Sequence, residues 1–207
     1  MTLRSTIAFI ISIAAISARA GIDLTPAVSE YSADGIKLQQ LTFRDDKRRI
    51  EYEPPRGWTF EGSPSELHLH PPKKNFVDAV VAVTPLEKSQ PLDENSIKKI
   101  EEQFAAVLPP GNQFVKIENR AENSVLLDGN PSFEIVASYQ LMGAKFMRSA
   151  IFVNLSGSQL MFRISAPSED FQALYRDFRV SIFSWHWLAA EDTSAQTAAA
   201  ATSASAH

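Results

Sequence analysis

Residues 131–166, PSFEIVASYQLMGAKFMRSAIFVNLSGSQLMFRISA, decide the fold class of this chain. Three segments rich in β-branched and aromatic residues follow one another here, which is typical of β-strands. They are Pro131–Met142, Lys145–Leu155 and Gln159–Ala166. The links Met142-Gly143-Ala144 and Ser156-Gly157-Ser158 have the composition of tight turns. Strands joined by such short turns pair antiparallel, so the stretch predicts an antiparallel meander.

Further strands are predicted on the N-terminal side of this meander. Leu41–Phe43 and Ile50–Tyr52 alternate apolar and polar residues, and the charged run Arg44–Arg49 lies between them. This pattern predicts a hairpin with a solvated tip. Phe76–Leu86 is a nearly continuous apolar run, which favours a central strand buried on both faces. Two more short strands are predicted at Phe114–Asn119 and Ser124–Leu127.

Two helices are predicted from apolar residues at three- and four-residue spacing. The first covers Asp93–Leu108, with Asp93 as its N-cap, and Pro109-Pro110-Gly111 ends it. The second begins at Ser168, a residue favoured at N-caps, and runs to about Phe178. Their apolar stripes are Ile97, Ile100, Phe104, Val107 and Leu108 in the first, and Phe171, Leu174, Tyr175 and Phe178 in the second.

These elements predict an α+β domain in which a mostly antiparallel sheet is sandwiched by two main helices, an α/β/α arrangement. Each helix carries one apolar stripe and therefore packs through one face. The predicted central strand has apolar residues on both faces, so we expect one helix on each side of the sheet.

The motif Tyr52-Glu53-Pro54-Pro55-Arg56-Gly57-Trp58, a Y-x-x-P-x-G-W pattern, resembles the PsbP-like fold. The mid-chain helix around Ile97–Leu108, the meander and the closing helix follow in the order of that family. The resemblance covers roughly Leu41–Trp187. It implies a binding or assembly role without catalysis, and it supplies no set of functional residues for this chain.

The ends of the chain differ in composition from its middle. Residues 1–20 combine Arg4, an apolar run at Ile7–Ile16 and the ending Ala18-Arg19-Ala20, as in a secretory signal peptide. Residues 21–35 show no periodicity and are expected to form a flexible leader. The globular domain is expected at 36–188. Residues 189–207 are rich in Ala, Ser and Thr and are expected to form a disordered tail.

Charge and composition exclude several classes of protein. The whole chain carries a formal charge of −4, and the first twenty residues contribute two arginines and no acidic residue. The remainder therefore stands at −6, which argues against a nucleic-acid partner. The sequence has no polybasic run for anionic lipid. It has no cysteine, which excludes thiol catalysis, thiolate zinc sites and iron–sulfur clusters.

Glu66-Leu67-His68-Leu69-His70 is the candidate metal site. On a strand, alternate side chains share a face, so Glu66, His68 and His70 would point the same way. Two imidazoles and a carboxylate are ligands that zinc accepts. The alternative is that these residues are the exposed polar positions of an amphipathic strand.

Trp185-His186-Trp187 is the candidate partner-binding site. Exposed tryptophans beside a histidine can form a binding platform. The alternative, which we favour, is that they seal the edge of the core, with each indole N–H finding a backbone partner. Asp78 lies within an apolar run, and a structural ion pair is the favoured interpretation over a general acid.

The sequence favours an exported, soluble, non-catalytic binding or assembly protein of the cell envelope or extracellular space. Its partner would be a protein or an envelope component, with no cofactor, no nucleic acid and no integral membrane segment after signal cleavage. One alternative is an exported metal-binding protein that uses Glu66, His68 and His70. A second alternative is a hydrolase with an unrecognised site.

Export is directly testable. The residues before Gly21 have the composition of a cleaved signal, so mass spectrometry of the protein recovered from its native host should give an N-terminus at Gly21. Recovery of the intact chain, beginning at Met1, from the cytoplasm would contradict the prediction.

Overall fold

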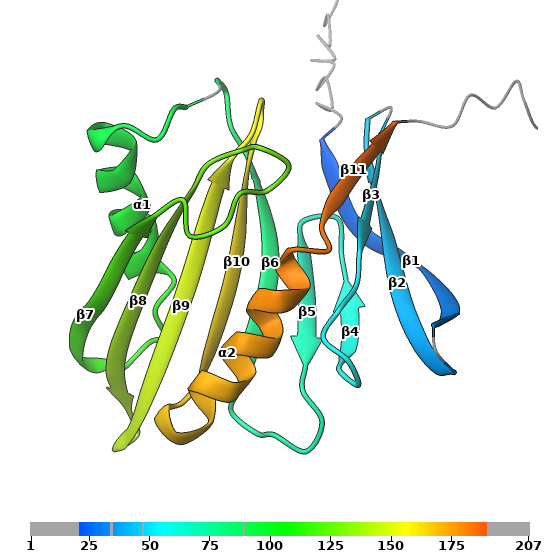
Figure 1. Ribbon diagram of the computed structural model, residues 1–207. Helices are drawn as coiled ribbons and strands as arrows, with labels where there is room; N and C mark the ends of the chain where they lie inside the picture. Colours follow the sequence, from blue (N-terminus) through cyan, green and yellow to red (C-terminus); the bar gives the residue numbers. More distant parts are fainter. Residues whose placement is uncertain (1–20, 34, 47, 89, 190–207) are drawn as a thin grey trace, which may run out of the picture.

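A computed structural model describes residues 21–33, 35–46, 48–88 and 90–189. The signal peptide predicted at 1–20 lies outside the described residues, as does the predicted tail apart from Ala189. The described residues form two antiparallel sheets and two main helices (Figure 1). The structure therefore confirms the α+β class, with one more sheet than the sequence suggested.

The larger sheet has seven strands in the order β4-β5-β6-β10-β9-β8-β7, and every pair is antiparallel. The predicted meander forms its β8-β9-β10 part. The strands are β4 (Thr59–Gly62), β5 (Glu66–His70), β6 (Asp78–Pro85), β7 (Gln113–Glu122), β8 (Ser132–Leu141), β9 (Ala144–Asn154) and β10 (Ser158–Pro167). Residues Ser124–Leu127 were predicted as a strand, but they form no strand and contribute only the isolated bridge of Leu127 to Asn130.

The smaller sheet has four strands in the order β1-β2-β3-β11. They are β1 (Ile22–Ala33), β2 (Ile36–Asp45), β3 (Arg48–Tyr52) and β11 (His186–Ala189). The predicted hairpin is the β2–β3 pair. The predicted flexible leader at 21–35 is wrong, because β1 pairs with β2 along nearly its whole length. Most side chains of β1 after Leu24 are exposed, so its sequence lacks the apolar alternation that marks a strand.

The two helices begin in different ways. In α1 (Glu94–Ala106), the Asp93 carboxylate accepts from the backbone N–H of Ser96 at 2.8 Å, and the Ser96 hydroxyl accepts from the N–H of Asp93 at 2.9 Å. The predicted Asp93 cap is thus confirmed as a reciprocal capping box. In α2 (Ser168–Ile182), Pro167 occupies the cap position. The prediction of Ser168 as N-cap is wrong, since Ser168 is the first helical residue and its side chain caps nothing.

The helices cover opposite faces of the larger sheet (Figure 1). Ile100 and Phe104 of α1 pack in a cluster with Phe152 of β9. Phe178 of α2 belongs to a second cluster with Ile151, the neighbour of Phe152 on the same strand. Because adjacent strand residues point to opposite faces, the predicted helix–sheet–helix arrangement is confirmed.

The smaller sheet shares the hydrophobic core on the α2 side. Leu41 and Phe43 of β2 and Ile50 of β3 lie in the same cluster as Phe162 of β10 and Phe178 of α2. Among the described residues, no helix is long and apolar enough to cross a membrane.

The α1 stripe can be tested by Phe104→Ala. Phe104 is 2% exposed, so truncation leaves a cavity and should lower the free energy of unfolding by about 3–5 kcal/mol. The control is Phe183→Ala, which truncates a side chain that is 56% exposed and should cost less than about 1 kcal/mol. Chemical denaturation of both variants measures the difference, and equal losses would contradict the assignment of Phe104 to the core.

Candidate functional site

Strand β5, which carries the candidate metal site, has the predicted alternation, and its two histidines lie beside different carboxylates. Leu67 and Leu69 of β5 are buried, whereas Glu66 and His70 are exposed and His68 is half-buried. His68 Nε2 lies 3.2 Å from the Glu66 carboxylate. His70 Nε2 lies 3.4 Å from a different carboxylate, that of Glu61 on β4. No group of three or more His, Asp or Glu side chains in the described part of the chain is arranged to hold a metal ion.

The Trp185-His186-Trp187 segment divides between core and surface. Trp185 is 1% exposed and packs against Phe43, Tyr52 and Phe162. It is therefore a core residue, and the hypothesis of a three-residue binding platform is wrong for it. Its indole nitrogen has no acceptor among the described residues, contrary to the expected backbone partner.

Trp187 and His186 form the outer part of this segment. The Trp187 indole N–H donates to the carboxylate of Asp45 at 2.8 Å, and the Arg48 guanidinium lies 5.6 Å from the Trp187 ring centroid. Asp45 also accepts from Arg48 at 2.5 Å. Asp45 is mostly buried, so the charged run predicted as a solvated tip contributes to packing. His186 is exposed.

Asp78 takes part in a structural ion pair, the favoured interpretation. Its carboxylate lies 3.0 Å from the Arg163 guanidinium and 3.4 Å from that of Arg148. Arg148 is 2% exposed and also donates to the backbone carbonyl of Val107, at the end of α1. Burial, together with the neighbouring Arg163, lowers the pKa of Arg148. These contacts attach the end of α1 to the sheet.

Glu134 of β8 is a buried carboxylate that no sequence pattern had identified. It accepts hydrogen bonds from Ser149 at 2.7 Å and Tyr175 at 2.6 Å, and it pairs with Arg179 at 3.2 Å. Burial and the bond to Glu134 raise the pKa of Tyr175 to about 12. Because three donors from β9 and α2 already use this carboxylate, it holds α2 against the sheet. Glu134 alternates with the apolar residues Phe133 and Ile135, so the pattern of β8 indicates an exposed polar position there and not a buried one.

Two cavities of about 430 and 410 Å³ flank the loop after β3. Both are lined by Leu38 and by Glu53, Pro54, Pro55 and Arg56, the segment that carries the family resemblance. The first also reaches Arg176 and Asp177 of α2, and the second reaches Lys37. Their linings mix charged and apolar side chains without a buried ionisable group.

The clearest candidate surface is made of Phe76, Phe114 and Met142, which we call the apolar end. Their side chains are 80%, 76% and 97% exposed, the highest values among the large apolar side chains of the described residues. All three have a left-handed backbone, with φ of 62°, 53° and 51°. A bulky residue in this region is a conformational outlier. Exposure and backbone strain thus coincide at the same three positions.

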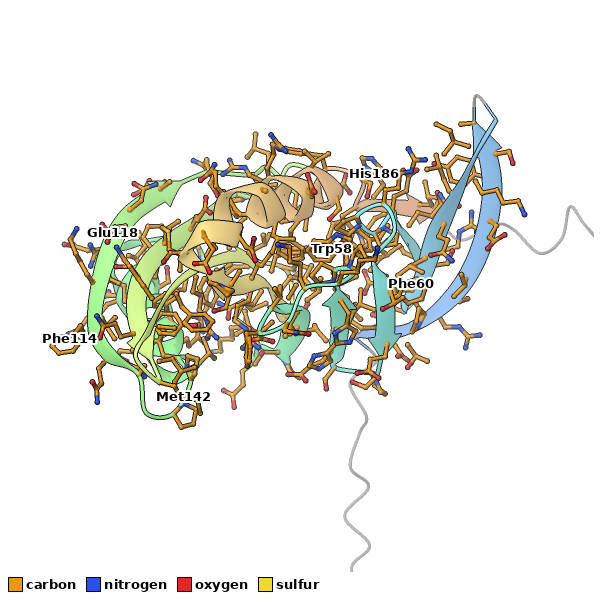
Figure 2. All side chains as sticks on the ribbon, turned by 90° about the horizontal axis from the view of Figure 1, so that it is seen from below. Trp58, Phe60, Phe114, Glu118, Met142 and His186 are labelled. Carbon is orange, nitrogen blue, oxygen red and sulfur yellow. The ribbon has the colours of Figure 1, made fainter. Side chains whose placement is uncertain are left out.

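The fold brings these three residues to one end of the larger sheet. Strand β5 runs toward this end and stops at His70, and Phe76 lies in the loop that leads back into β6. Met142 lies in the turn from β8 to β9. Phe114 lies at the start of β7, which pairs with the end of β8. Figure 2, which looks at the molecule from below, shows Phe114 and Met142 at its outer boundary.

The apolar end could be predicted only in part from the sequence. Met142-Gly143 was correctly predicted as a turn, and methionine is unusual where two-residue hairpins favour Asn or Asp. Phe76 and Phe114 were assigned to strands because each adjoins an apolar run. The structure places Phe76 in a loop before β6, and Phe114 at an irregular point where the β7 register shifts.

Comparisons with known proteins give a fold likeness. No family model matches the chain, and no match is found among curated proteins. The solution structure of PsbP from the cyanobacterium Synechocystis sp. PCC 6803 is similar at 13% identity and a TM-score of 0.46, over 77% of this chain and 92% of that one. The crystal structure of protein PA94 of Pseudomonas aeruginosa, of unknown function, is similar at 13% identity and a TM-score of 0.44, over 75% and 93%. No function of this chain follows from these likenesses.

The strain at Met142 is testable by Met142→Asn. Met142 and Gly143 both have positive φ, as in the type I′ turns that favour Asn-Gly. The substitution should therefore raise the free energy of unfolding, by about 1 kcal/mol. Leu126→Asn, at a side chain that is 62% exposed and lacks positive φ, should change it by less than about 0.5 kcal/mol. A loss of stability in Met142→Asn, measured by chemical denaturation, would show that Met142 is a packing residue.

Proposed function

We propose that this protein is an exported, soluble, non-catalytic binding or assembly protein of the cell envelope or extracellular space, and that it binds through the apolar end. The observation that carries the proposal is the coincidence of exposure and left-handed backbone at Phe76, Phe114 and Met142. Large apolar side chains that are exposed at one end of a protein are candidates for an interaction site.

The strain supports a role in binding rather than in folding. Each left-handed bulky residue costs of order 1–3 kcal/mol, and Gly or Asn would avoid most of that cost. In water the exposed apolar side chains recover none of it by packing. Burial against a partner would give these side chains the apolar contact that they lack in the free protein.

The ionisable groups of the described residues favour structural roles. Asp78 is neutralised by Arg163 and Arg148, and Glu134 by Arg179. General acids and bases usually face an open site where substrate can approach, and these groups instead connect α1 and α2 to the sheet. Hydrolysis therefore has less support than binding.

The proposal can be tested by fractionating the native host. The triple variant Phe76→Asn/Phe114→Asn/Met142→Asn removes the apolar end with a residue that tolerates a left-handed backbone, so it should stay folded. We expect the exported wild-type protein to be associated with an envelope component or a larger assembly, and the triple variant to be free.

The matched control removes three exposed apolar side chains elsewhere, by Leu126→Asn/Val180→Asn/Phe183→Asn. It should distribute like the wild type. If the wild-type protein is already free, or if the triple variant distributes as the wild type does, the apolar end is not the binding surface.

A further inference from the structure

We propose that the partner of the apolar end is the surface of an anionic lipid bilayer, into which Phe76, Phe114 and Met142 insert. This inference rests on the proposed function, because it assigns the chemistry of the surface that the apolar end binds. Peripheral attachment of this kind depends on buried apolar area together with attraction between basic side chains and anionic headgroups. The structure provides both at this end.

Lysines accompany each of the three apolar residues. Lys73 and Lys74 precede Phe76, Lys116 follows Phe114, and Lys145 follows Met142, all within three positions and all exposed. The lone acidic residue within three positions of any of the three is Asp78, whose carboxylate is held by Arg148 and Arg163.

The charge of this end differs in sign from that of the whole protein. The four lysines share this end of the sheet with the carboxylates of Glu118, Glu169 and Asp170, and two of these form pairs, Lys74 with Asp170 and Lys116 with Glu118. When Asp78 and its partners Arg148 and Arg163 are included, six basic groups stand against four acidic ones here, whereas the chain as a whole carries −4. An anionic surface would attract this end and repel the rest, which fixes the orientation of docking.

The spacing of the three residues fits a flat partner. They are distributed from β6 to β7, and the strands between these two are β10, β9 and β8. Four interstrand intervals of about 4.8 Å give a span of about 19 Å. A small ligand or short peptide would bind in a groove, and the two cavities described above are lined by other residues. A bilayer surface contacts separated side chains along an edge without needing a groove.

Two of the three residues, Phe76 and Met142, lie in a loop and a turn, which also suits insertion into lipid. Backbone N–H and C=O groups are costly to bury in hydrocarbon unless they are hydrogen-bonded. At Met142, in a two-residue turn, the side chain is 97% exposed, so it can enter the lipid ahead of the backbone. The long stems of the adjacent lysines can lie along the interface while their ammonium groups stay with the headgroups.

Lipid binding is not predictable from a local sequence pattern, because the chain contains no polybasic run. The lysines of this end come from three separate segments, and only the fold assembles them next to the apolar side chains.

The test is co-sedimentation of the processed protein, recovered from the exported fraction of its host, with vesicles. One set contains phosphatidylglycerol and phosphatidylethanolamine, and the other contains phosphatidylcholine alone. We expect wild-type protein to bind the anionic vesicles more tightly than the neutral ones, and more weakly at high salt. The Phe76→Asn/Phe114→Asn/Met142→Asn variant should lose on the order of tenfold or more in partitioning. The Leu126→Asn/Val180→Asn/Phe183→Asn variant should bind like the wild type.

Two charge-reversal variants isolate the electrostatic contribution to vesicle binding. Lys73→Glu/Lys145→Glu should weaken binding to anionic vesicles and leave binding to neutral vesicles unchanged. Lys98→Glu/Lys99→Glu, on the exposed side of α1, makes the same change in total charge and should have the smaller effect.

Two results would overturn the lipid inference. One is that wild-type protein fails to bind either set of vesicles, and the other is that the triple asparagine variant binds as well as wild type. If the protein does not bind vesicles but the apolar end is still needed for association in the host, the partner is a protein, and the proposed function stands without the lipid. If the protein does not bind vesicles and the apolar end is not needed for association in the host, the proposed function is also wrong.

Discussion

Trp185 packs against aromatic side chains from both sheets, and the relative position of the two sheets depends on this packing. Its ring centroid lies 5.5 Å from that of Phe43 in the smaller sheet and 5.4 Å from that of Phe162 in the larger one. Because Trp185 lies three residues after the last residue of α2 and directly before β11, the same contact fixes where the last strand begins relative to the helix. The indole N–H is buried without an acceptor in the described residues, which costs about 1–3 kcal/mol. The aromatic packing must offset that cost.

Specific polar contacts hold each of the two helices against the larger sheet. Arg148 attaches the end of α1 to the sheet, and Glu134 attaches α2 through Tyr175 and Arg179. The net free energy of unfolding of a protein is only about 5–15 kcal/mol. The conformational strain at the three residues of the apolar end, of order 1–3 kcal/mol each, is a substantial fraction of that value.

The sequence predicted the parts of the fold whose signals are local. The Asp93 cap and the stripe through Ile100 and Phe104 predicted α1, and glycine-containing turns predicted the meander. Strand β1 was missed because its side chains are mostly exposed and its pairing with β2 is made by the backbone. The second sheet was missed because the pairing of β11 with β3 joins segments more than a hundred residues apart. No local pattern specifies such a contact.

The candidate site was harder to predict than the fold. Histidines and tryptophans were chosen as candidate site residues because imidazole and indole groups have distinctive chemistry. In the structure, Trp185 is in the core and the histidines pair with separate carboxylates. The residues of the apolar end have ordinary chemistry, and what distinguishes them is exposure and backbone conformation. Neither property can be read from an apolar residue type. Phe76 was therefore wrongly taken for a strand residue, and Phe114, which does lie in β7, was not recognised as exposed.

The most direct measurement uses the absence of cysteine in this chain, which allows one introduced thiol to carry one fluorophore. Met142→Cys places an environment-sensitive dye at the apolar end, and Leu126→Cys places it in the loop between β7 and β8, at the other end of the sheet. With anionic vesicles, we expect the emission at position 142 to rise and shift to the blue, and the emission at position 126 to stay unchanged. An unchanged emission at position 142, or an equal change at both positions, would contradict insertion through the apolar end.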